Sequence, residues 1–139
     1  MLFTLSTDKT MSETAADLTA AVEAHHFGVM HIHNLKETMA KKGVAFGPEC
    51  LIFEVCQPQQ AKKVLEGNMS ISTALPCRIS VYEKGGKTIL ATLKPTVLLA
   101  MFDTPQLDTV AQDVEATITE IMKEAATPRV AALALPDSR

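Results

Sequence analysis

The sequence is poor in aromatic residues and carries no excess of positive charge. Its 139 residues include no tryptophan, one tyrosine and five phenylalanines, so a folded core must be built from aliphatic side chains and methionine. Thirteen basic against sixteen acidic side chains give a net charge of -3, which argues against a protein that binds nucleic acid through a basic face. The lysine pairs Lys41-Lys42 and Lys62-Lys63 have no interleaved aromatic residues on which bases would stack. We expect no nucleic-acid partner.

Long apolar runs and cysteines are also few. The longest apolar runs, 96–102 and 130–135, are far shorter than the roughly 20 residues that span a membrane. The first residues lack the basic and apolar regions of a signal peptide. Three cysteines are an odd number and too few for a disulfide scaffold. We therefore expect a cytoplasmic protein with reduced thiols and no membrane partner.

Signatures of cofactor and metal sites are missing as well. The sequence has no glycine-rich dinucleotide or phosphate-binding loop, no nucleophile elbow and no zinc-binding pattern. Gly85-Gly86-Lys87 lacks the first glycine, the Ser or Thr and the following helix of a phosphate loop, so a hairpin turn is the better interpretation. We expect no cofactor, and a binding protein is favoured over an enzyme.

The apolar residues suffice for one folded domain. Apolar side chains make up 47% of the sequence and charged ones 21%, a balance that excludes an intrinsically disordered chain. A chain of this length forms about one domain. We assign residues 1–126 to it and expect the proline-punctuated stretch 127–139 to be a loosely ordered tail.

Periodicity along the chain predicts the element order β-α-β-α-β-α-β-β-α. Alternating apolar residues predict strands at 2–6, 28–33, 51–55, 77–83 and 88–93. Helical spacing predicts helices at 11–26, from 34 to 43, from 58 to 67 and from 104 to 126. This order is typical of an α+β fold in which helices pack on one face of a mainly antiparallel sheet.

Capping and turn residues support these boundaries. Thr10 and Glu13 have the spacing of a capping box at the start of the first helix, and Gly28 is placed to end that helix. Gly85-Gly86 predicts a tight turn between the last two strands, because both glycines accept a positive φ.

Three short motifs follow one another along the chain. They are Cys56-Gln57-Pro58 after a strand, Leu75-Pro76-Cys77 before a strand, and Gly85-Gly86 between two strands. In this order and spacing, over roughly residues 3–125, the sequence resembles the bacterial and archaeal family catalogued as domain of unknown function 302. The resemblance implies a TATA-binding-protein-like α+β fold, usually as a homodimer, and it implies no established reaction.

Cys56 and Cys77 stand at the motif positions and are the candidate catalytic residues. A cysteine just before a helix gains thiolate character from the helix amides, and a helix is predicted to start at Pro58. Two such thiols could pair reversibly or carry sulfur. The alternative is that both are small buried hydrophobes, because a reactive cysteine needs a base or cation nearby and only Arg78 is adjacent in sequence. Strict alternation puts Cys77 on the core face with Ile79.

Alternation also gathers polar side chains on the sheet face opposite the helices. The predicted ligand-binding set is His31, His33, Glu54, Cys56, Arg78, Ser80 and Tyr82, with Val29 and Ile52 mixed in. A few convergent polar groups suit a ligand groove, but a dimer interface or a plain solvated face would show the same pattern. His31 and His33, two residues apart on one strand, are weak candidates for metal ligands.

Two functions from different classes remain open. The first is a non-catalytic module that binds a small ligand or a protein partner through this polar face and acts as a homodimer. The second is a cysteine-dependent enzyme of thiol chemistry or sulfur transfer that uses Cys56 and Cys77. The lack of any catalytic signature favours the first.

Overall fold

The computed structural model describes residues 1–129, which form a five-stranded antiparallel sheet with helices around it. The sheet order is β1-β5-β4-β3-β2, and the strands are β1 (Leu2–Thr7), β2 (Gly28–Asn34), β3 (Cys50–Cys56), β4 (Cys77–Lys84) and β5 (Lys87–Leu93). Every neighbouring pair is antiparallel. The predicted α+β fold is therefore confirmed. Residues 130–139, which hold most of the predicted tail, lie outside the described residues.

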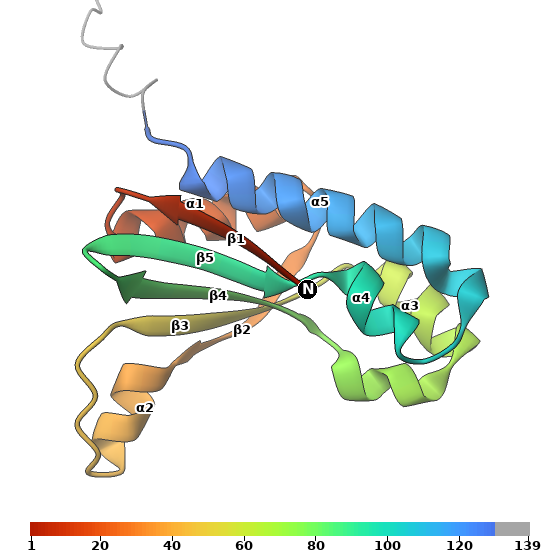
Figure 1. Cartoon of the computed structure of the whole chain (residues 1–139), viewed down its shortest axis with the longest axis horizontal. Helices are drawn as coiled ribbons and strands as arrows, with labels where there is room; N and C mark the ends of the chain where they lie inside the picture. Colours follow the sequence, from red (N-terminus) through yellow and green to blue (C-terminus); the bar gives the residue numbers. More distant parts are fainter. Residues whose placement is uncertain (130–139) are drawn as a thin grey trace, which may run out of the picture.

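Two long helices, α1 (Met11–Ala24) and α5 (Asp108–Ala126), cover one face of this sheet (Figure 1). The remaining segments connect strands: α2 (Leu35–Lys41), α3 (Pro58–Gly67), α4 (Pro95–Ala100) and the 3-10 turns η1 (Met69–Ala74) and η2 (Pro105–Leu107). The sequence pattern did not predict α4 or η1, and the helix predicted from 104 to 126 begins at Asp108, with η2 as a 3-10 turn before it. Within the described part of the chain, no helix is both long and apolar enough to cross a membrane.

The core lies between the sheet and these two long helices. Its fully buried side chains are Phe53, Val55, Ile79, Val81 and Leu90 from the sheet, and Leu18, Val22, Ile118, Ile121 and Met122 from α1 and α5. Burying each such side chain contributes about 1.5–3 kcal/mol. The larger part of the aliphatic core thus lies in the helix-covered layer that the alternation predicted, and a smaller cluster of Val64, Ile71 and Leu107 lies between α3, η1 and η2.

Local signals set most of the helix boundaries. The Thr10 hydroxyl accepts a hydrogen bond from the Glu13 amide, and the Glu13 carboxylate accepts one from the Thr10 amide, so the predicted capping box is present. The predicted end of this helix was wrong. His26, and not Gly28, takes the left-handed conformation, with a φ of 64°. Gly28 is already paired with Cys56 in the sheet, so the chain must turn two residues earlier.

Strand register confirms one sequence prediction and corrects another. The Gly85-Gly86 turn has positive φ at both residues, as a two-residue hairpin requires. In β2, however, the register shifts between Val29 and His31, which leaves Met30 as an extra residue. Val29 therefore pairs with Val55 on the core face, and its predicted place among the polar residues was wrong.

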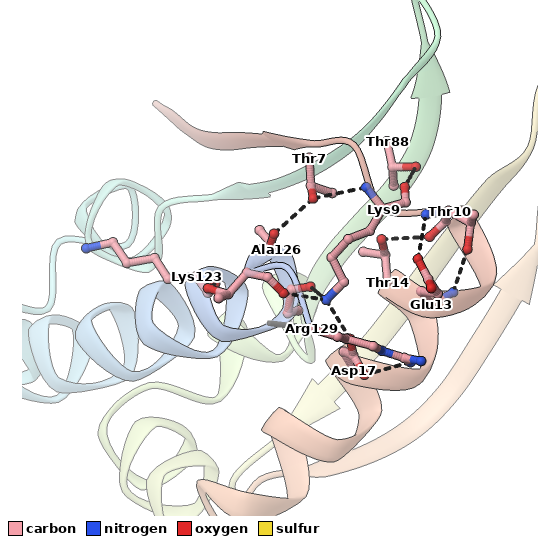
Figure 2. Close-up of polar contacts among 12 residues, drawn as sticks. Thr7, Lys9, Thr10, Glu13, Thr14, Asp17, Thr88, Lys123, Ala126 and Arg129 are labelled. Atoms are coloured by element: carbon pink, nitrogen blue, oxygen red, sulfur yellow. Dashed lines mark hydrogen bonds and ion pairs between the residues drawn. The ribbon is translucent and has the colours of Figure 1, made fainter. Parts of the chain in front are cut away.

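A buried lysine fastens the N-terminal segment to the end of α5 (Figure 2). The Lys9 side chain is 6% exposed, and its ammonium donates to the Asp17 carboxylate and to the carbonyls of Ala125 and Thr127 at 2.7 and 2.8 Å. Arg129 donates two further hydrogen bonds to Asp17. The hydrogen bond from Arg129 has the largest effect and that from Lys9 adds to it, and together they lower the pKa of Asp17 to about 2. In the predicted tail, Thr127 is thus bonded to Lys9 and Arg129 to Asp17 of α1.

Candidate functional site

The sheet face opposite α1 and α5 has no long helix over it, and we call it the open face. Residues paired across a strand ladder lie on the same face, so the register identifies its side chains. They include His31, His33, Ile52, Glu54, Arg78, Ser80, Tyr82, Ala91, Leu93 and Leu2. Apart from Cys56, all the predicted ligand-binding residues therefore share this face.

Glu54 lies at the centre of the polar part of the open face. Its Oε2 is 3.2 Å from Nε2 of His33 and 3.5 Å from Nε of Arg78. The Glu54 side chain is 19% exposed, whereas those of His33 and Arg78 are 40% and 62% exposed. The His31 ring packs edge-on against His33, with ring centroids 4.3 Å apart. These four residues, Glu54, His33, His31 and Arg78, form what we call the Glu54 cluster.

The electrostatics of this cluster favour an ionised carboxylate. The hydrogen bond from His33, followed by the charges of His33 and Arg78, outweighs burial and holds the pKa of Glu54 below its ordinary value. Among residues 1–129, no group of three or more His, Cys, Asp or Glu side chains is placed to hold a metal ion. The cluster presents a carboxylate acceptor beside imidazole and guanidinium donors on the open face.

Tyr82 and Ser80 lie further along β4. Ser80 pairs with Ile52 beside the cluster, but Tyr82 pairs with Cys50 at the start of β3, two residues further away. The structure thus brings His33, Glu54 and Arg78 into contact and leaves Tyr82 apart.

A groove beside the Glu54 cluster is lined mainly by apolar side chains. It has a volume of about 510 Å³ and lies between the open face and the η1 and α4 segments. Its apolar walls include Leu2, Ile52, Leu93, Leu98, Met101 and Phe102, and its polar walls include Arg78, Ser80 and Thr92. Small-ligand sites occupy about 300–1,000 Å³, so the groove has the size of a binding site.

The apolar walls of the groove were missed in the sequence. A signal for α4 was present, because Pro95 suits a first helical position and Leu98 follows it at helical spacing. No local sequence pattern predicts that Leu2 and Leu93 are neighbours, because they come together only through the pairing of β1 with β5. The groove could therefore be found only after the strands were ordered.

Cys56 and Cys77 lie apart from the Glu54 cluster, in a separate apolar cavity between β3, α3 and α5. The cavity volume is about 40 Å³, enough for one or two water molecules. Cys56 is the last paired residue of β3, and its side chain lines this cavity, contrary to the open-face position that strict alternation predicted. Cys77 packs against the core, as alternation predicted, and also reaches the groove.

Burial raises the pKa of both thiols, which lowers the fraction present as thiolate at neutral pH. It raises the pKa of Cys56 above its ordinary value, and burial together with the nearby Cys56 raises the pKa of Cys77 to about 11. No disulfide joins the cysteines. The Oε1 atom of Gln60 in the same cavity is buried without a hydrogen-bond partner among the described residues, a position that suits an ordered water.

Fold and surface together define an α+β domain with one helix-covered and one open sheet face. The chain belongs to the family described as domain of unknown function DUF302, whose model matches residues 3–125. The crystal structure of an uncharacterized conserved DUF302 protein from Bacillus stearothermophilus is similar, with a TM-score of 0.85 and 31% sequence identity over 89% of this chain and 97% of that one. No curated protein matches the chain. The predicted family is thus confirmed, and no activity comes with it.

Proposed function

We propose that the chain is a non-catalytic binding module that acts as a homodimer and holds a small polar ligand on its open face. The observation that carries this proposal is the Glu54 cluster. It sets an ionised carboxylate beside the side chains of His33 and Arg78, on a sheet face without a long helix and next to a groove of about 510 Å³.

The chemistry of the cluster indicates the kind of ligand. Glu54 accepts hydrogen bonds, and Arg78 donates them. Arg78 contacts Glu54 through Nε, which leaves its two terminal nitrogens without a protein partner in the described part of the chain. A molecule that carries both donors and acceptors would be recognised by such a pair. We therefore propose a small polar ligand with both kinds of group.

The second interpretation is an enzyme that uses Cys56 and Cys77 for thiol chemistry or sulfur transfer. It draws on the fact that both motif cysteines line one cavity. We place it second, because burial raises the pKa of both thiols and neither has a base or cation as partner among the described residues. Three free thiols suit a reducing compartment, so we propose a cytoplasmic location.

A thermal-shift panel of amino acids, nucleotides, small carboxylates and divalent metal ions tests the ligand proposal. At about a hundred times its Kd, a ligand should raise the melting temperature of the wild type by about 5–10 °C. Glu54→Gln and Arg78→Gln should lose most of that shift, while Glu66→Gln on the exposed surface of α3 should keep it. Absence of any shift, or a shift that persists in Glu54→Gln, would contradict the proposed site.

A further inference from the structure

The segment formed by α2 and the loop after it, residues 35–48, has little to pack against in its own chain, and we call it the α2 arm. None of the seven residues of α2 is buried, and in the loop Val44 and Phe46 are 53% and 42% exposed. Figure 1 shows the arm projecting from the sheet on the side away from α5. A helix this short is marginal in water and normally gains its stability by packing an apolar face. The α2 arm therefore leaves apolar side chains available to a partner surface.

The groove lies at the other end of the strands. The α2 arm follows β2 and precedes β3, whereas η1 precedes β4 and α4 follows β5. In an antiparallel sheet these connections fall at opposite ends, as Figure 1 shows. Leu93 and Met101 in the groove are 42% and 64% exposed. Exposed apolar surface of this kind marks interaction sites.

We propose that the α2 arm of one copy packs into the groove of a second copy, and that the second copy does the same in return. This inference rests on the homodimer of the proposed function and names the surfaces that form it. A twofold axis that lies parallel to the sheet and crosses its strands obliquely places the two open faces together and exchanges their ends, and it moves each arm from the β2 edge toward the partner's β4 and β5. Each arm then meets the partner's groove, and two identical contacts close the assembly.

The charges of the two surfaces are complementary. Lys42 ends α2 just before the exposed Val44, and Asp103 directly follows Phe102, which lines the groove. Lys42 and Asp103 are both exposed, and neither forms an ion pair within residues 1–129. A lysine beside apolar residues on the arm thus matches an aspartate beside apolar residues at the groove.

The Glu54 cluster is self-complementary in the same arrangement. It carries one acidic and one basic side chain close together, Glu54 and Arg78. A twofold axis can therefore place Glu54 of each copy opposite Arg78 of the other. On a single chain the cluster lies on an uncovered face, whereas ligand sites are concave and enclosed. Two facing sheets, closed at both ends by the arms, would enclose it. The ligand site is therefore incomplete without the second copy.

Light scattering after size-exclusion chromatography, over a concentration series, tests the contact by measuring the Kd of the dimer. Lys42→Glu and Asp103→Lys should each raise this Kd about tenfold or more, and the double variant should return it to within about threefold of the wild type. Phe46→Ser should also raise it, because the arm loses its largest apolar side chain. Lys63→Glu on the exposed surface of α3 is the matched charge control and should leave it unchanged.

The outcomes separate this contact from the proposed function. A wild-type dimer that Lys42→Glu and Phe46→Ser leave intact would overturn the arm contact while the homodimer stands. A double variant as weak as the single ones would overturn the Lys42–Asp103 pairing. A wild-type chain that stays monomeric up to about 1 mM would overturn both the contact and the homodimer. Asp103 has a φ of 50°, which strains a lysine, so the melting temperature of every variant is measured to show that it is folded.

Discussion

Replacing Lys9 with methionine is expected to lower the free energy of unfolding by about 3–5 kcal/mol, the usual cost of removing one partner of a buried ion pair. Methionine keeps most of the side-chain volume but cannot donate the three hydrogen bonds to Asp17, Ala125 and Thr127. The two carbonyls at the end of α5 would then be left without a donor inside the protein. Urea unfolding followed by circular dichroism measures the change.

The matched control is Lys62→Met. Lys62 and Glu66 form an ion pair one helical turn apart on α3, with side chains 74% and 64% exposed. Exposed pairs of this kind contribute about 0.3–0.5 kcal/mol, so this variant should unfold almost like the wild type. A loss below about 1 kcal/mol in Lys9→Met would show that the buried lysine does not fasten α5 to the N-terminal segment.

Cys77 is expected to react with iodoacetamide at pH 7 about a hundred times more slowly in the folded protein than in the unfolded chain. Burial, followed by the effect of Cys56, raises its pKa from 9.0 to about 11. The thiolate is the reacting species, and its fraction falls tenfold for each pH unit by which the pKa rises. Mass spectrometry of the labelled peptides follows all three cysteines in one sample, with and without denaturant.

This labelling decides between the two proposed functions. Cys50, at the start of β3, is part-exposed in the single chain and serves as the internal reference for reagent access at concentrations below the Kd of the dimer. Slow labelling of both Cys56 and Cys77 supports a structural role for the motif cysteines. Rapid labelling of either one in the folded protein below about pH 7 would contradict the burial argument and favour the cysteine-dependent enzyme.

Much of the fold was predictable because its signals are local. The Thr10 capping box and the Gly85-Gly86 turn each depend on two or three neighbouring residues, and both are present. Alternation correctly separated Phe53 and Val55 from Glu54. α4 was missed although Pro95 and Leu98 have helical spacing, because six residues are too few to distinguish a helical period from a chance match.

The site was predictable only where its residues alternate regularly. His33, Glu54 and Arg78 were placed together because period-two spacing holds along three neighbouring strands. The bulge at Met30 results from the pairing of β2 with β3, and no residue within β2 predicts it. Lys9 likewise has the pattern of an ordinary surface lysine, because two of its three acceptors, the carbonyls of Ala125 and Thr127, lie more than a hundred residues away at the end of α5.

Solvent contact at the open face tests the central claim most directly. A soluble paramagnetic probe relaxes methyl NMR signals in proportion to their exposure, and in the single chain Leu2, Leu93 and Met69 are 59%, 42% and 69% exposed. We expect the Leu2 and Leu93 methyl groups to be protected at concentrations where the dimer forms, while Met69, which lines neither the groove nor the α2 arm, stays accessible. Leu2 and Leu93 signals that relax in proportion to their single-chain exposure at every concentration would contradict an open face covered by a second copy.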